Sequence, residues 1–311
     1  MEFLKAILFG IVEGITEWLP VSSTGHMILL NEFIKLDVSE RFWNVFLVVI
    51  QLGAILAVIY VYWERIIPFY RIYPSDEEFE EYGEYAKLRT GIDTESLYLW
   101  IKILIACIPA GIVGVLLDDW VDAHLYNWVV VSIMLILVGI ALIVVEAYTR
   151  GRRPFIGDMA EFTYKEVFII GLFQVIAAVL PGTSRSGITI IAALLLGATR
   201  RASVDFTFVL AVPVMLGASL LKIVKNGLGH DMIEWILLIL GIGTAFLVSQ
   251  FVIRFFLDYV LTHSLAPFGL YRIGLGIVVI LVFAIRGLYT HFSGGAEETA
   301  MLAGILSGLP V

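Results

Sequence analysis

Cysteine is almost missing from this sequence, and charged residues are few. The only cysteine, Cys107, lies in an apolar run, so the chain can build neither an intramolecular disulfide nor a cysteine-based metal site. We expect Cys107 to be a small core residue. Charged residues make up 15% of the 311 positions, and no basic tract is present; the net charge of -8 comes largely from one acidic stretch at 76–84. These features argue against a nucleic-acid partner.

Apolar residues dominate instead. They make up 60% of the chain, and the mean hydropathy of +0.95 is far above that of a soluble domain. The first twenty residues lack the basic leader and cleavage site of a signal peptide, so we expect them in the mature protein. Uninterrupted apolar segments long enough to span a bilayer occur at 45–63, 99–117, 128–147, 206–224, 234–256 and 270–289. The composition predicts an all-α integral membrane protein with a single membrane domain over residues 1–311.

Two further apolar segments, 3–34 and 165–197, are broken in the middle. The breaks read LPVSSTGH and LPGTSRSG, and each half is too short to cross a bilayer alone. Broken backbone at membrane depth is tolerated only where protein or a watery cavity satisfies its polar groups. The sequence therefore predicts two re-entrant helix hairpins in addition to six transmembrane helices.

The Lys and Arg residues of the loops predict the orientation. The loops at 64–98 and 148–165 carry several basic residues each, whereas 118–127 has three aspartates and no Lys or Arg. Because basic loops face the cytoplasm, we expect the first two inside and the third outside. The hairpins then enter from opposite sides, which predicts inverted repeats over about 1–147 and 165–289, followed by a tail at 290–311. It also predicts a site that opens toward the external face of the plasma membrane.

The two halves show the repeat in their sequences, although chance similarity between two Ser/Gly-rich breaks remains an alternative. Inverted repeats with discontinuous helices usually place a polar site at their interface near the bilayer midplane. A shift of 161 positions aligns Gly10 with Gly171, Glu13 with Gln174, Leu19-Pro20 with Leu180-Pro181, and Ser22-Ser23 with Thr183-Ser184.

Glu13 and Glu17 are four residues apart, so on a helix both carboxylates lie on one face. Two anions so close in a membrane segment repel each other unless a cation or a proton is shared. The pair predicts a divalent-cation site or an acid/base pair; the alternative is a pair at the membrane surface.

Serine and threonine hydroxyl groups occur in both breaks. The run SSTGH at 22–26 brings hydroxyls and an imidazole together, which are the parts of an activated nucleophile, although Ser-Ser-Thr is also an ordinary helix start.

The run PGTSRSGIT at 181–189 combines hydroxyls, a helix start and Arg185, which together can cradle a phosphate. A structural salt bridge from Arg185 to Glu13 or Glu17 is the alternative. We interpret the remaining basic residues Lys5, Lys165, Arg200 and Arg201 as interfacial anchors.

The run EGITEWLPVSSTGH at 13–26, the run PGTSRSGIT at 181–189 and the late FGLYR at 268–272 are similar to motifs of the undecaprenyl-diphosphate phosphatase family, the bacitracin-resistance proteins. The resemblance extends over most of the chain. It implies six spans and two re-entrant hairpins in inverted repeats. It also implies removal of the terminal phosphate from a C55-type polyprenyl diphosphate, which recycles the lipid carrier for cell-envelope glycan synthesis and gives bacitracin resistance.

For that chemistry we expect Glu13 and Glu17 to hold Mg2+ or Ca2+. We expect Ser23 to be the nucleophile and His26 its base, with attack by His26 itself or by a metal-bound water left open. Glu17 and Arg185 complete the expected catalytic set. The expected substrate-binding residues are Ser22, Thr24, Gly182, Thr183, Ser184, Ser186, Thr189 and Arg272.

The expected partners are the polyprenyl diphosphate and membrane lipids, and the chain could assemble as a homodimer. A phosphatase of the phosphatidic-acid type is disfavoured, because that superfamily needs a second histidine soon after its arginine and none follows Arg185 within nine residues. A polyprenyl-phosphate transporter or flippase fits the repeat equally well. Transport alone, however, would not need hydroxyl, imidazole and paired carboxylates together.

Overall fold

The computed structural model describes residues 1–72, 89–228 and 231–307. Within them, six helices are long and apolar enough to cross a membrane, and each overlaps most of one predicted span. The chain is therefore a multi-pass membrane protein, as predicted. These helices are Glu40–Val61 (α3, Glu40–Val49, continued by α4, Gln51–Val61), α7 (Thr94–His124), α8 (Trp128–Thr149), α11 (Arg200–Asn226), α12 (Met232–Thr262) and the Ala266–Arg286 part of α13.

Each broken segment forms two shorter helices. The first gives α1 (Glu2–Thr16) and α2 (Ser23–Phe33), and the second gives α9 (Tyr164–Val179) and α10 (Arg185–Leu195). The loop after α4 holds a short helix α5 (Trp63–Ile66) and an antiparallel ribbon of β1 (Phe69–Ile72) and β2 (Arg89–Ile92). A 3-10 turn, Met159–Glu161, precedes α9, and α13 (Ala266–Ser307) continues into the expected tail.

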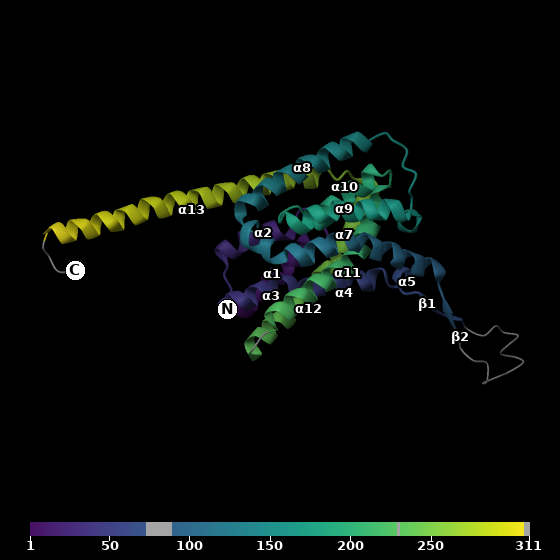
Figure 1. Cartoon of the computed structure of the whole chain (residues 1–311), viewed down its shortest axis with the longest axis horizontal. Coiled ribbons are helices and arrows are strands. Elements are labelled where there is room, and N and C mark those ends of the chain that lie inside the picture. The colour runs from purple at the N-terminus through teal and green to yellow at the C-terminus, as the bar shows by residue number, and fades with distance from the viewer. Residues whose placement is uncertain (73–88, 229–230, 308–311) are drawn as a thin grey trace, which may run out of the picture.

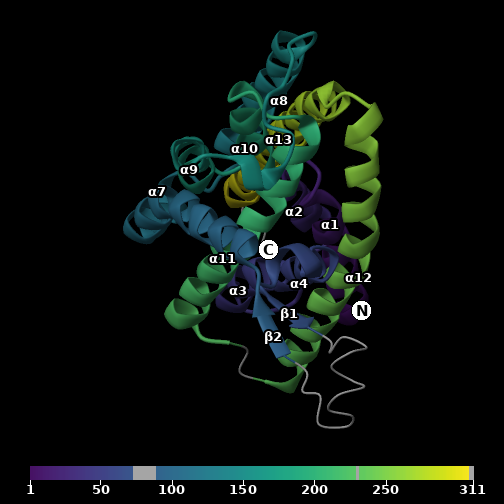
Figure 2. The same ribbon diagram turned by 90° about the vertical axis from the view of Figure 1, so that its right-hand side faces the viewer.

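The helices pack in pairs that bring distant parts of the sequence together. On one flank α12 lies against α1 and α4, and on the opposite flank α7 lies against α9 (Figure 2). The α13 helix runs beside α8 and then extends beyond the bundle (Figure 1). The interior is formed by α10 and the first half of α11, whose residues from Ala202 to Val212 are all buried. The two broken segments thus contribute to the centre of the molecule.

Small residues allow these helices to approach closely, as is common between membrane helices. A Cβ built on Gly53 of α4 would lie 2.0 Å from the backbone oxygen of Ile242 in α12, so no side chain fits there. Gly243, the next residue of α12, has open space around it.

We therefore expect Gly53→Ala to destabilise the protein by roughly 1–3 kcal/mol, the usual range for overpacking, because α4 and α12 must separate. Gly243→Ala is the matched control, since it adds the same methyl group to open space and should be neutral or stabilising. Thermal unfolding in one detergent compares the two variants. Equal melting temperatures would contradict the close contact.

Candidate active site

The two helix breaks meet in the interior through the starts of α2 and α10. The N-cap residues Ser22 and Ser184 have φ angles of 74° and 68°, and among the described residues they are the only non-glycine residues with positive φ. Such backbone costs of order 1–3 kcal/mol and persists where the surrounding structure imposes it. The two caps correspond at a shift of 162, one more than the sequence shift of 161, because α10 begins one residue later after its Leu-Pro pair than α2 does. The same strained geometry therefore starts both inner helices.

A cavity of about 440 Å³ lies between the two breaks and is also walled by parts of α7, α9 and α11. It brings together most of the residues predicted for the site. These are Glu17, Ser22, Ser23, Thr24, Gly182, Thr183, Ser184, Arg185 and Ser186. Glu13, His26, Thr189 and Arg272 do not line it.

Glu17 connects the two breaks. One of its carboxylate oxygens accepts from the Arg185 guanidinium at 2.9 Å, and the other accepts from the Ser23 hydroxyl at 2.8 Å. Both side chains of the Glu17–Arg185 pair are about nine-tenths buried, with exposures of 10% and 11%. The ion pair that the sequence offered as an alternative is present. It joins a carboxylate of the first motif to the arginine of the second.

Arg185 is held in a fixed orientation at the start of α10. Its guanidinium also donates to the Thr207 carbonyl of α11 at 3.1 Å, and its Nε is buried without a partner. The Ser184 hydroxyl accepts from the Gly187 backbone N–H at 3.1 Å, which caps the helix. The start of α10 thus offers hydroxyls and a guanidinium fork at one wall of the cavity, which is the donor set that phosphate oxygens require.

His26 has other partners than the expected Ser23. Its Nδ1–H donates to the Ser22 carbonyl at 2.7 Å, so Nε2 is left as the acceptor of the Tyr271 hydroxyl at 2.7 Å. The two rings are also stacked, with centroids 5.6 Å apart. In this structure the group that accepts the Ser23 proton is Glu17 and not His26. The pairing of Ser23 with His26 stays a prediction.

Glu13 lies one turn below Glu17 and is fully buried, with Oε1 lacking a hydrogen-bond partner. No cluster of three or more His, Cys, Asp or Glu side chains able to hold a metal occurs in the described part of the chain. Two carboxylates alone do not form a complete cation site. They do fit a site that is completed by substrate, because Mg2+ is commonly held by one or two carboxylates together with substrate phosphates.

Arg272 was expected to bind substrate, but in the structure its contacts are with backbone carbonyls of the two breaks. It is fully buried, and its guanidinium donates to the carbonyls of Gly182 and Thr183, both at 2.9 Å, and of Pro20 at 3.3 Å. These carbonyls follow the C-terminal ends of α9 and α1, where helix dipoles are negative. Arg272 therefore fastens the two breaks to each other and takes no direct part in lining the cavity. Thr189 is similarly internal, donating to the Arg185 carbonyl at 2.8 Å.

We expect Arg272→Gln to lower the stability of the folded protein by roughly 1–3 kcal/mol for each buried carbonyl of the two breaks that loses its donor. Lysine cannot replace it, since one ammonium does not reach several carbonyls with a planar fork. The measurement is thermal unfolding of Arg272→Gln and Arg272→Lys, with the exposed Arg254→Gln as the control. A normal melting temperature combined with lost substrate binding would restore Arg272 as a substrate ligand.

The cavity also has polar residues that sequence reasoning did not select. Gln174 of α9 lines it, is buried, and has neither amide atom hydrogen-bonded. Its alignment with Glu13 in the two halves of the chain is the sequence signal that points to it. Cys107 lines the wall and is half-buried while packing against the hydrophobic core, so the expectation of a core residue holds only in part. Asp118 and Lys222, 3.2 Å apart, line the end of the cavity nearest the C-termini of α7 and α11.

Comparison with known proteins gives a consistent result. The family model described as "Bacitracin resistance protein BacA" matches residues 6–278. The undecaprenyl-diphosphatase of Desulfitobacterium hafniense is 48% identical over 286 residues, which cover 92% of this chain and 98% of that protein. Undecaprenyl-diphosphatase 1 of Clostridium acetobutylicum is 50% identical over 285 residues, covering 92% and 98%. The similarity therefore includes both breaks and all of the cavity.

Proposed function

The chain belongs to the BacA family of bacitracin resistance proteins, and we propose that it hydrolyses undecaprenyl diphosphate in the cavity between its two broken helices. Undecaprenyl-diphosphatase activity is the activity of the relatives that it matches over nine-tenths of its length. The observation that carries the assignment to this cavity is the bridge formed by Glu17, which holds a hydroxyl and a guanidinium from opposite motifs at hydrogen-bond distance.

Substrate binding follows from the donors in the cavity. The fork of Arg185 would bind the terminal phosphate, with the N–H groups and hydroxyls at the starts of α2 and α10 around it. The Ser22 hydroxyl supports this role, because it lines the cavity and is buried without a partner. Because Arg185 is paired with Glu17 at rest, a bound diphosphate shares the guanidinium with that carboxylate or replaces it.

For the chemical step we propose Ser23 as the nucleophile. Glu17 takes the proton of the Ser23 hydroxyl, Oγ bonds to the terminal phosphorus, and the bond from phosphorus to the bridging oxygen breaks, releasing undecaprenyl phosphate. Water then attacks the phosphorus of the phosphoserine and the bond from phosphorus to Oγ breaks; Glu17 returns its proton to Oγ, and inorganic phosphate leaves with the protons of the water. Arg185 stabilises the charge on the phosphate oxygens, which is the main requirement of phosphoryl transfer.

The divalent cation fits beside this arrangement. Glu13 and Glu17 would hold it together with diphosphate oxygens, and it would neutralise charge on the substrate. The unpartnered Oε1 of Glu13 supports the assignment, because a buried carboxylate oxygen without a donor is otherwise costly.

The two hairpins, α1–α2 and α9–α10, are proposed to be re-entrant and related by inverted repeats. Their matching strained caps support this, as does the presence of three long membrane helices after each hairpin. With the basic loops inside, the end of the cavity at Asp118 and Lys222 opens toward the external face.

We predict the orientation from single cysteines placed in a Cys107→Ala background. Ala123→Cys, exposed near the end of α7, should react in whole cells with a thiol reagent that does not cross membranes. Glu95→Cys, exposed at the start of the same helix, should react only after the cells are opened. The reverse pattern would invert the topology and place the mouth of the cavity inside.

The test of the function is phosphate release from undecaprenyl diphosphate by purified protein in detergent, with a soluble phosphomonoester as the substrate control. Hydrolysis that is lost in Ser23→Ala supports the proposal. A protein that binds the lipid without releasing phosphate would be the transporter that the sequence left open.

A further inference from the structure

A second and larger cavity, of about 1060 Å³, lies at the other end of the helix bundle from Asp118 and Lys222. It is formed where α8, α10 and α12 end and where α9 and α11 begin, together with the loop from Arg150 to Phe155. The α11 helix shows the separation, since Arg200 and Arg201 at its start line this cavity and Lys222 near its end lines the catalytic one. The two cavities are thus distinct.

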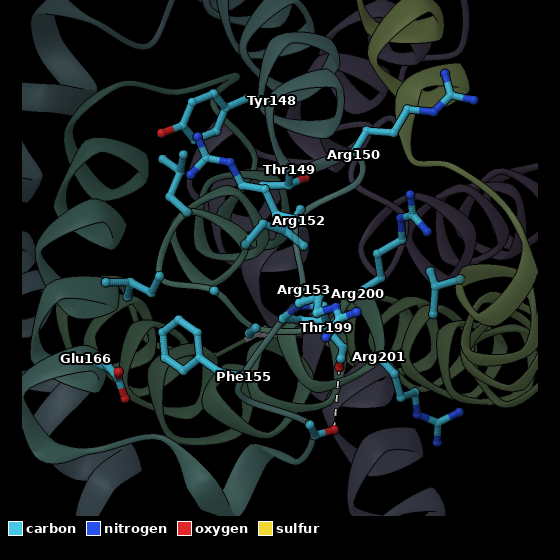
Figure 3. Close-up of a pocket in the computed structure, with 18 of the residues that line it drawn as sticks. Tyr148, Thr149, Arg150, Arg152, Arg153, Phe155, Glu166, Thr199, Arg200 and Arg201 are labelled. Atoms are coloured by element: carbon cyan, nitrogen blue, oxygen red, sulfur yellow. Dashed lines mark hydrogen bonds between the residues drawn. The ribbon is translucent and has the colours of Figure 1, made fainter.

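Positive charge dominates the lining of the second cavity. Glu166 is the one carboxylate among its lining residues, and it already accepts from the Thr163 backbone N–H at 2.7 Å. Figure 3 shows Glu166 on the opposite side of the cavity from Arg200 and Arg201. The six basic residues of the lining are Arg150, Arg152, Arg153, Lys165, Arg200 and Arg201. Residues expected to be separate interfacial anchors therefore converge on one cavity.

Only part of this charge is balanced within the protein. Arg200 pairs with Glu146, Arg201 pairs with Asp205 at 2.9 Å, and Arg152 lies 3.6 Å over the Tyr148 ring (Figure 3). Three of the six side chains have no ion-pair or hydrogen-bond partner among the residues that the structure describes, namely those of Arg150, Arg153 and Lys165. Three unpaired positive side chains around one cavity produce a positive electrostatic potential that attracts an anion.

Part of the remaining lining is apolar and exposed. Phe155, Leu195 and Leu261 line the cavity and are exposed large hydrophobic residues. Leu195 and Leu261 lie at or near the ends of α10 and α12, and Phe155 lies in the loop that follows α8, at the level where the hydrocarbon core of a bilayer would meet the headgroup layer. A ligand at this place therefore meets cations on one side and hydrocarbon on the other.

We propose that this cavity binds the phosphate headgroup of an anionic phospholipid of the surrounding membrane, with the acyl chains against the apolar rim. Basic pockets between membrane helices are suited to such headgroups, and the loop charges place this end of the bundle on the cytoplasmic side. Arg153 and Lys165 bind the phosphate from two different elements, the loop and α9. Binding here needs no catalytic residue, so it is independent of hydrolysis.

The experiment is native mass spectrometry of the lipid-stripped protein with phosphatidylglycerol and with phosphatidylcholine of the same acyl chains. Wild-type protein should retain phosphatidylglycerol preferentially. Arg153→Gln/Lys165→Gln should weaken that retention by about 25-fold, from the contribution of roughly 1 kcal/mol that each basic residue makes near a membrane surface. The control, Lys35→Gln/Arg254→Gln, removes two exposed cations outside the cavity and should behave as wild type.

Several results would overturn the proposal. Equal retention of the two lipids by the wild type would do so without any variant, and so would equal weakening by the control pair. A melting temperature raised by inorganic phosphate, with no preference for phosphatidylglycerol, would replace the lipid headgroup with a free anion. Arg153 and Lys165 are exposed and unpaired, so the lipid-free melting temperature of their variant should match that of the wild type.

Discussion

Replacing Arg185 with lysine should leave a folded protein that has lost most of its phosphatase activity. Lysine keeps a positive charge beside Glu17 but offers no planar pair of donors to a phosphate. Removal of one oriented donor from a developing oxyanion typically costs about 10²–10³ in kcat, and we expect a loss of that order. Phosphate release from undecaprenyl diphosphate, measured beside thermal unfolding in the same detergent, gives both quantities.

Arg185→Ala is the informative comparison, because the arginine is paired with Glu17 in the resting protein. Without it a buried carboxylate has no counter-charge, and breaking such a pair costs about 3–5 kcal/mol. We therefore expect the alanine variant to lose stability as well as turnover. If Arg185→Lys retained near-normal turnover, the arginine would have only a structural role, and the phosphate would bind elsewhere in the cavity.

The stability expected of Arg185→Ala depends on a contact that the sequence could not specify. The motifs indicated that Arg185 faces an anion, and they allowed a bound phosphate, Glu13 or Glu17. The choice depends on how α10 is placed against the end of α1, a contact between residues 168 positions apart. Local patterns do not determine such a long-range contact.

The membrane helices were predictable because their physical cause is local. Length and apolar content alone require Glu40–Val61 and the other spans to be helical in a bilayer, since an unpaired backbone group there is costly. The breaks were predictable for the same reason, as their turn-forming residues interrupt otherwise apolar segments. The additional beginning of α3 at Glu40 and the extension of α7 to His124 lie in more polar flanks, where hydropathy gives no signal.

The hydrogen-bond partners of the site residues could not be predicted from the sequence. Ser23 and His26 are three residues apart on α2, so their spacing allowed a hydrogen bond. The structure satisfies His26 through the Ser22 carbonyl in the preceding turn and through Tyr271 of α13, a residue far along the chain. Arg272, next to Tyr271, is likewise occupied by backbone carbonyls that only the packed fold brings together.

Glu17→Gln should cause the other large loss of activity, because the amide cannot take a proton from Ser23. Glutamine has nearly the same shape, so its hydrogen-bonding group still reaches the Ser23 hydroxyl, but its neutral oxygen is a far weaker base. Loss of a general base typically costs about 10²–10⁴ in rate, and we expect kcat to fall within that range. Glu13→Gln is the comparison, since Ser23 and Arg185 hydrogen-bond to Glu17 and not to Glu13, and it should alter mainly the dependence on Mg2+ concentration.

The double variant Glu17→Gln/Ser23→Ala tests whether the two residues act as one unit. Residues that share a single step give strongly non-additive losses, because the base has no function once the nucleophile is gone. We therefore expect the double variant to be about as slow as Ser23→Ala alone. Multiplied losses would mean that Glu17 acts apart from Ser23, through the cation or Arg185, and that the attacking group is water. Because Glu17→Gln also leaves Arg185 without its carboxylate, the melting temperature of each variant is measured beside its rate, so that loss of folded protein is not counted as loss of chemistry.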